Sequence, residues 1–213
     1  MLTVYGYPLS GPSNKVRYTI EYIGLEYGWE VIDLQSGEAR TDEYRQLHPA
    51  EKVPVIEQDG FTLFESGAIC RYLCEREQSD LYPSNVEQRA LVNQWTDFTV
   101  QHVYRAVSKV VYNRVFAPKM DREVDKRSLQ EGLEWLAQYF PIVDDSLSDS
   151  QFFCGDQLSL ADITLISALD YAPIGNIDLS QYDEITTWKN TIESMDFWLS
   201  CKDDRQELLQ KMA

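Results

Sequence analysis

Two serines, Ser10 and Ser13, lie in a short loop within the stretch GYPLSGPSNKVRY, residues 6–18, which starts like a strand and finishes like a helix. The backbone N–H groups and the dipole of a helix N-terminus favour an anion or a thiolate at such a loop. A serine there can cap the helix, or it can donate a hydrogen bond to a bound ligand. Ser13 is placed to cap a helix that begins at Asn14.

Two further groups with binding chemistry follow in the first half of the chain. Lys52-Val53-Pro54-Val55 places a proline at the start of a strand, where its missing N–H is tolerated and a cis peptide bond is possible. Glu65-Ser66 stands at a corner between a strand and a helix, where the Ser66 hydroxyl and nearby amides can bind a carboxylate. The sequence thus predicts three polar places for an anionic ligand, which one fold can bring together.

The elements that must position these residues alternate between strand and helix over the first 80 residues. In chain order we expect a strand, a helix, a strand, a short helical turn, a hairpin and a helix, at residues 3–5, 14–23, 29–33, 42–46, 53–64 and 65–75. The hairpin is indicated by Asp59-Gly60 between two apolar runs. This order predicts a small α/β domain, residues 1–80, with a mixed sheet.

The second half of the chain carries helical patterns almost throughout. A polar break at residues 78–86 separates it from the first half, and we expect an all-helical domain over residues 87–213. Its clearest local signal is Ser159 with Asp162, which form a capping box with Asp in place of the usual Glu or Gln. We assign this pair a structural role, because an N-cap stabilises its helix and needs no further function to account for its residues.

Charge and composition exclude several classes of function. The net charge is −16, from 19 basic and 35 acidic side chains, and such a surface repels phosphate backbones and anionic membranes. We therefore expect no nucleic-acid partner and no membrane association, and the absence of a leader-like or spanning apolar run predicts a cytoplasmic protein. The four cysteines and two histidines show no metal-ligand spacing, so no metal is expected and the cysteines are interpreted as buried free thiols.

Together these motifs resemble those of a known family. The serine-bearing loop, the helix with Lys15-Val16-Arg17 and the stretch HPAEKVPVIEQDGFTLFESGAICRYL, residues 48–73, are similar to the thioredoxin-like domain of cytosolic glutathione transferases. The SLAD sequence at 159–162 resembles the capping motif of the family's helical half. The resemblance covers nearly the whole chain, and the PLSG opening is most similar to bacterial members of the serine classes. It implies a four-stranded mixed sheet followed by a helical bundle.

The resemblance also implies a glutathione site in the first domain, with glutathione as co-substrate. Val53, just before a cis proline, would pair through its backbone with the cysteinyl part of glutathione. Glu65 and Ser66 would hold the γ-glutamyl carboxylate and amine, and Lys52 would contact the glycyl carboxylate. Arg40 lies near the place where relatives use a basic residue for the same carboxylate.

Ser10 is the predicted catalytic residue, since its spacing to Arg17 is that of the serine classes. Its hydroxyl would donate a hydrogen bond to the glutathione sulfur, stabilising the thiolate and lowering the pKa of the thiol without a histidine base. Three alternatives stay open: Tyr5 or Tyr7 on the first strand, as in the tyrosine classes; Ser13; or no hydroxyl at all.

The activity that the resemblance implies is that of a glutathione transferase, which directs the thiolate at small hydrophobic electrophiles, in a homodimer. A glutathione-dependent peroxidase, disulfide reductase or isomerase is the alternative, as is a non-catalytic binding or assembly module of the same fold. The co-substrate cleft would face the helical domain, where Tyr104, Val107, Val111 and Tyr112 can form one side. Aromatic and apolar residues at helical spacing are also what a core requires.

Overall fold

A computed structural model of the chain describes residues 1–34 and 36–212. Contacts divide the chain into two compact units. The first consists of Met1–Ser79 together with the segment from Ser194 onward, and the second is Asp80–Glu193. The predicted second domain covers 87–213, whereas the contacts group the segment after Glu193 with the first unit.

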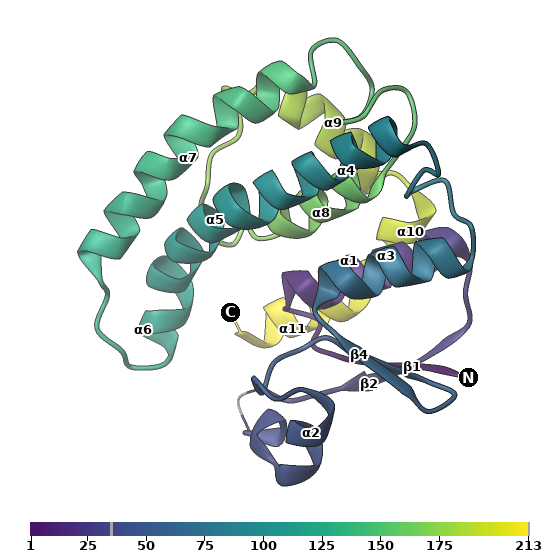
Figure 1. Ribbon diagram of the computed structural model, residues 1–213. Helices are drawn as coiled ribbons and strands as arrows, with labels where there is room; N and C mark the ends of the chain where they lie inside the picture. Colours follow the sequence, from purple (N-terminus) through teal and green to yellow (C-terminus); the bar gives the residue numbers. More distant parts are fainter. Residues whose placement is uncertain (35, 213) are drawn as a thin grey trace. The chain divides into compact units, whose positions relative to one another are not determined.

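The first unit contains a four-stranded sheet in the order β2-β1-β3-β4 (Figure 1). Its strands are β1 (Leu2–Gly6), β2 (Tyr27–Val31), β3 (Val55–Gln58) and β4 (Phe61–Phe64). β1 and β2 are parallel, while β1 with β3 and β3 with β4 are antiparallel. The predicted mixed sheet is therefore confirmed. Asp59 and Gly60 turn the hairpin with φ angles of 52° and 82°, the left-handed backbone that a tight hairpin turn requires.

Helices cover both faces of this sheet (Figure 1). On one face lie α1 (Gly11–Ile23) and α3 (Ser66–Arg76), and on the other lie the 3-10 turn η1 (Glu38–Arg40) and α2 (Asp42–Leu47). The packed faces of α1 and α3 are apolar, with Val16, Ile20, Ile69 and Leu73 fully buried. Gly24 ends α1 in the left-handed conformation, at φ 78°, as its position after the apolar repeat predicts.

The last segment of the chain adds α10 (Asp196–Leu199) and α11 (Lys202–Met212) to the first unit. Phe197 packs edge-on against Tyr18 and Tyr22 of α1, with ring centroids 5.9 and 6.0 Å apart. The buried guanidinium of Arg17 lies 3.0 Å from the Asp204 carboxylate. These contacts join residues that are far apart in the sequence, so local sequence patterns do not predict them.

The second unit is built from helices, as predicted. They are α4 (Val86–Phe98), the π-helical η2 (Thr99–Val103), α5 (Tyr104–Val111), the π-helical η3 (Tyr112–Phe116), α6 (Ala117–Lys119), α7 (Lys126–Ser146), α8 (Leu160–Leu169) and α9 (Asp183–Glu193). Every residue of α8 is buried, so this helix forms the centre of the unit. Between residues 80 and 193, all of which the structure describes, the β pairing is limited to an isolated bridge between Phe152 and Gly155.

The predicted capping box begins α8. The Oγ of Ser159 accepts from the Ala161 N–H at 3.3 Å, and the Asp162 carboxylate accepts from the Ser159 N–H at 2.9 Å. Asp162 is fully buried and also accepts from the Phe153 N–H and from the Trp188 Nε1–H, each at 3.0 Å. One carboxylate thus ties together the start of α8, the preceding loop and α9, which confirms its structural role.

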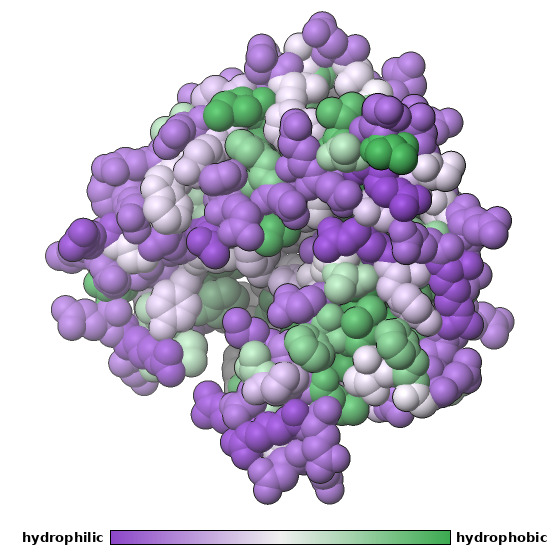
Figure 2. Space-filling model, viewed as in Figure 1, coloured by the Kyte–Doolittle hydropathy of each residue, from purple (hydrophilic) through white to green (hydrophobic). Residues whose placement is uncertain are grey.

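Hydrophilic side chains dominate the displayed face of the molecule (Figure 2). An apolar area lies over β4, where Phe61 and Phe64 are 45% and 38% exposed. Within the described residues, the structure contains no helix with the length and apolar character needed to cross a membrane.

Candidate functional site

The sheet topology brings the three predicted polar segments to one end of the first unit. Tyr5 of β1 pairs with Val55 at the start of β3, and Val55 pairs with Phe64 at the end of β4. The loop after β1, the residues before β3 and the corner after β4 therefore converge at the same edge. Ser10, Val53 and Glu65 come from these three segments.

Ser10 is the N-cap of α1. Its backbone is extended, and its Oγ accepts from the Ser13 N–H at 3.3 Å. The bond uses a lone pair of the hydroxyl oxygen, so the hydroxyl proton stays available for donation. The side chain is partly exposed, and the first turn of α1 contains no acidic residue. Ser10 therefore presents a donor at a helix N-terminus.

Ser13 does not cap the helix, contrary to the prediction. The helix begins at Gly11, three residues earlier than Asn14, and Ser13 lies within its first turn. Its side chain is fully buried, and its Oγ accepts from the Tyr7 N–H at 3.2 Å. Pro12 was the available signal for this boundary, because proline is favoured at the first positions of a helix.

Asn14 lies beside the loop of Ser10, and no role was predicted for it from the sequence. It is buried, and its Nδ2 donates to the Pro8 carbonyl at 3.0 Å. Together with the bond from Tyr7 to Ser13, this contact attaches the start of the loop that carries Ser10 to the first turn of α1. The loop is thus held by side chains of the helix that follows it.

The two tyrosines near the end of β1 keep their protons. The Tyr5 hydroxyl donates to the Glu57 carboxylate at 3.2 Å, and burial followed by that carboxylate raises its pKa. Tyr7 packs against a small apolar cluster that includes Tyr44 and Val53. Burial and, to a smaller extent, the negative charge of Asp33 raise the pKa of its phenol. The Tyr5 hydroxyl is engaged with the sheet.

Val53 and Pro54 are joined by a cis peptide bond, as the sequence analysis allowed. The Val53 side chain is buried in the same apolar cluster, with Ala39, Tyr44 and Val55. The ladder of β3 begins only at Val55, so the Val53 backbone lies just before the paired part of the strand. This is the position from which a backbone can pair with an extended ligand.

Glu65 has an unusual backbone conformation directly before α3. Its φ of 70° and ψ of 106° lie outside the regions that residues with a Cβ normally occupy, and such strain concentrates at functional sites. Among the described residues no side chain caps α3, and Ser66, its first residue, is 9% exposed. The N–H groups of this helix start are therefore oriented toward a place where a carboxylate can bind.

His48 lies beside the predicted binding residues, although the sequence analysis gave it no role. It is buried and packs against Phe64, with ring centroids 4.7 Å apart. Burial lowers the pKa of His48, the negative charge of Glu65 opposes this, and the positive charge of the exposed Lys52 adds to it. Glu65 and Lys52 therefore both act on one buried imidazole. Arg40 is exposed at the end of η1, just before α2.

Known proteins resemble this chain along nearly its full length. Family models for the glutathione S-transferase N-terminal and C-terminal domains match residues 1–75 and 106–196. Glutathione S-transferase F10 of Arabidopsis thaliana is 31% identical over 204 residues, 93% of this chain and 94% of that protein. The chain belongs to the glutathione S-transferase family. Glutathione S-transferase D7 of Drosophila melanogaster is 27% identical over 190 residues, 88% of this chain and 82% of that protein.

Solved structures of glutathione S-transferases share the fold. Glutathione transferase F2 from Populus trichocarpa superposes with a TM-score of 0.89 at 26% identity, over 97% of this chain and 100% of that chain. These glutathione S-transferase relatives are plant and insect proteins. The predicted thioredoxin-like unit with a helical second unit is thereby confirmed.

The four residues predicted to form one side of the co-substrate cleft of this glutathione S-transferase differ in their exposure to solvent. Val107 and Val111 are 2% and 3% exposed within the helical unit, so they contribute to its core. Tyr112 is 39% exposed, and its hydroxyl accepts from Arg122 at 3.2 Å. Burial raises the pKa of Tyr104. Tyr112 is thus the most accessible of the four residues.

The cysteines of this glutathione S-transferase are free thiols. Cys70, Cys74 and Cys201 are buried as expected, whereas Cys154 is only partly buried. Among the described residues no group of three or more histidine, cysteine, aspartate or glutamate side chains could hold a metal ion.

Proposed function

We propose that the chain is a glutathione transferase in which Ser10 activates the glutathione thiol. The observation that carries this proposal is the geometry of Ser10, whose Oγ accepts the capping bond from the Ser13 N–H and keeps its proton for donation. A thiolate placed beside it would accept that proton in a hydrogen bond and would also be stabilised by the positive end of the α1 dipole.

The reaction follows from thiolate stabilisation. The thiol proton passes to solvent, and the sulfur then attacks an electrophilic carbon with its electron pair, so that a C–S bond forms. In a substitution the leaving group departs with its own electron pair; in an addition the electron pair moves onto the electrophile, which takes up a proton. Ser10 remains a neutral donor throughout, so no histidine base is required.

Binding of the tripeptide is assigned to the predicted residues around Ser10. The Val53 backbone pairs with the cysteinyl part, and Glu65 with Ser66 holds the γ-glutamyl end. Lys52 and Arg40 contact the glycyl carboxylate. Support comes from the convergence of these segments at one sheet edge and from the open N-terminus of α3.

The finer classification is also part of the proposal. We assign the protein to a serine class, on the position of Ser10, and we retain the bacterial type as a prediction from the PLSG opening. A homodimer is proposed, for which the exposed Phe61 and Phe64 supply apolar surface on the first unit. A cytoplasmic location and a role in detoxification complete the proposal.

Calorimetric titration with glutathione tests the function directly. The wild-type protein should bind glutathione at millimolar concentration or below, and the double variant Glu65→Ala with Ser66→Ala should lose that binding. Turnover of a chlorodinitrobenzene then separates a transferase from a binding module. A folded wild-type protein that binds no glutathione would exclude the proposal.

A further inference from the structure

The segment between α2 and β3 is held by side chains of α2. Tyr44, in the middle of α2, donates its hydroxyl proton to the Lys52 carbonyl at 2.8 Å. Lys52 directly precedes Val53, the residue whose backbone is assigned to the cysteinyl part of glutathione. A side chain outside the predicted site therefore makes a direct bond to its backbone.

The Tyr44 side chain contacts this segment in two ways. Its ring is 5% exposed and belongs to the apolar cluster with Ala39, Val53 and Val55, while its hydroxyl holds the carbonyl of Lys52. Burial, with a smaller contribution from Tyr5, raises the pKa of Tyr44 to about 12. The phenol consequently stays protonated, and it remains a hydrogen-bond donor at neutral pH.

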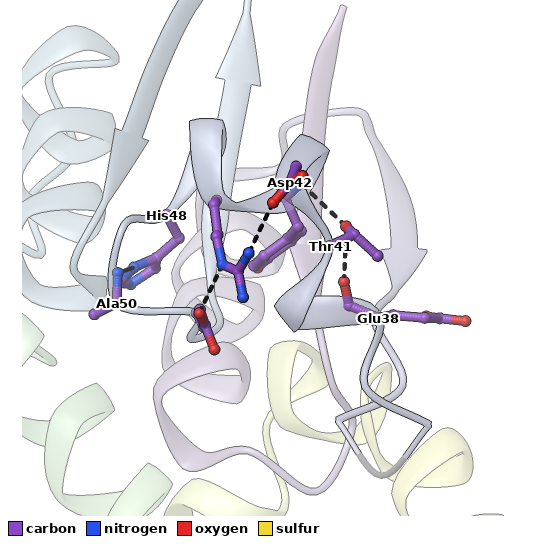
Figure 3. A network of polar contacts seen from close by, with 8 residues as sticks. Glu38, Thr41, Asp42, His48 and Ala50 are labelled. Carbon is purple, nitrogen blue, oxygen red and sulfur yellow. Dashed lines mark hydrogen bonds and ion pairs between the residues drawn. The ribbon is translucent and has the colours of Figure 1, made fainter.

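Two other contacts attach the turn before Lys52. The Arg45 Nε lies 2.8 Å from the Glu51 carboxylate. The His48 Nδ1 accepts from the Ala50 N–H at 3.2 Å, and Figure 3 shows these two residues side by side. Arg45 is 47% exposed, so solvent weakens its ion pair. Tyr44 is only 5% exposed, and its bond is the contact that reaches the residue next to Val53.

The Lys52 carbonyl and the Val53 N–H belong to one planar peptide unit. Between the described residues Lys52 and Val53 the peptide bond is not cis, so the two groups point in opposite directions. A hydrogen bond that fixes the direction of the carbonyl also fixes the direction of the N–H. The Tyr44 hydroxyl therefore sets the orientation of the donor that Val53 offers to a ligand.

We propose that Tyr44 is a positioning residue for glutathione, which acts by holding the Lys52–Val53 peptide plane in the orientation that pairs with the cysteinyl part. The inference rests on the proposed function. It assigns a binding role to a hydroxyl that does not touch the ligand, and it predicts an effect on glutathione affinity and not on the thiol.

The variant Tyr44→Phe removes the hydroxyl and keeps the ring in the cluster. Loss of one ordering hydrogen bond should weaken glutathione binding about fivefold to tenfold, seen as a raised Kd in calorimetry and a raised KM. The kcat at saturating glutathione and the pKa of the bound thiol should stay at wild-type values. Amide hydrogen exchange over Lys52 and Val53 should become faster.

Tyr27→Phe is the matched control. Tyr27 lies on β2, in the sheet of the first unit, and is partly buried. Its hydroxyl donates to the Glu21 carboxylate at 2.8 Å, the same length as the Tyr44 bond. This variant should lose stability without any change in glutathione affinity. All binding is measured below the melting transition of each variant, which keeps folding and binding apart.

The outcomes separate the two proposals. If the wild type binds glutathione and Tyr44→Phe binds it equally well, the positioning role is excluded and the proposed function stands. Equal weakening in Tyr27→Phe would also exclude it, because the effect would then be one of stability. A wild type that binds no glutathione overturns the proposed function itself, and the positioning role with it.

Discussion

Two helices of the molecule, α1 and α8, begin with a serine at the N-cap, and the two hydroxyls are used differently. At α8 the Ser159 hydroxyl accepts a backbone bond and donates to the Asp162 carboxylate at 2.8 Å. At α1 the Ser10 hydroxyl also accepts a backbone bond, but the residue at the position of Asp162 is Ser13, whose Oγ accepts from Tyr7.

The third residue of the helix thus decides what the capping serine can do. A carboxylate at that position accepts a hydrogen bond from the serine hydroxyl and completes the cap. The serine then has a structural role only. Without a carboxylate the proton stays available, and the partial exposure of Ser10 opens it to a ligand, whereas Ser159 is 3% exposed. The same cap is closed in one unit and open in the other.

The largest expected effect is on the closed cap. Asp162→Ala leaves three buried N–H donors without their acceptor, and each such group costs about 1–3 kcal/mol. We expect the free energy of unfolding, measured in urea, to fall by about 3 kcal/mol or more. The exposed Asp156 in the preceding loop provides a control, and Asp156→Ala should change stability by less than about 0.5 kcal/mol. Equal losses in both variants would contradict the structural role of Asp162.

The open cap is tested by Ser10→Ala. A hydrogen bond to a charged group is worth about 1.5–3 kcal/mol, so the pKa of bound glutathione thiol should rise by about 1–2 units. The kcat/KM at neutral pH should fall about tenfold to a hundredfold, followed by thiolate absorbance and by turnover.

Ser159→Ala is the matched change at the other cap. It should lower stability by about 1 kcal/mol and leave the thiol pKa unaltered. If Ser10→Ala leaves the thiol pKa in place while Tyr7→Phe raises it, the catalytic hydroxyl belongs to the tyrosine and the comparison of the two caps loses its functional meaning.

Ser13→Ala sharpens the comparison at the third helical position. The variant removes the buried acceptor of the Tyr7 N–H, which should cost about 1–2 kcal/mol of stability in urea denaturation. The thiol pKa should change less than in Ser10→Ala, since Ser13 holds the loop and has no access to the ligand. The exposed Ser148 offers a neutral control in Ser148→Ala. A thiol pKa shift as large as that of Ser10→Ala would assign the chemistry to Ser13.

The smallest expected effect is on the pH dependence of stability, and it comes from His48, the C-cap of α2. Its imidazole accepts from the Ala50 N–H, so protonation breaks that bond, and burial lowers its pKa below the ordinary 6.5. Below pH 6.5 the unfolded chain therefore binds more protons, and stability falls as the pH drops toward the folded pKa.

The slope should be at most about 1.4 kcal/mol for each pH unit, read from urea midpoints between pH 7 and about pH 5. His48→Asn, which keeps an acceptor for the Ala50 N–H, should lack this part of the pH dependence. An identical slope in wild type and variant would show that His48 does not contribute to the pH dependence of stability.

Local signals were sufficient for most of the fold. Asp59-Gly60 predicted the hairpin because its two residues tolerate positive φ, and the capping box was legible because both of its partners lie within four residues. The start of α1 was placed too late, since Pro12 was interpreted as part of the loop rather than as a favoured first-turn residue.

Contacts between distant residues were not legible. The bond from Tyr44 to Lys52 depends on how α2 packs under the sheet, and a tyrosine at an apolar position of a short helix indicates burial only. His48 was one of two histidines without a motif, and its place beside Phe64 follows from the hairpin geometry. In the same way nothing near Phe197 announces its partners on α1.

The return of α10 and α11 to the first unit has a consequence for synthesis. A ribosome synthesises the strands of the sheet before the second unit and these helices after the whole of it. Until then Tyr18 and Tyr22 lack the ring of Phe197, and Arg17 lacks the carboxylate of Asp204. The unit proposed to bind glutathione thus acquires its full set of contacts only after the whole of the second unit has been synthesised.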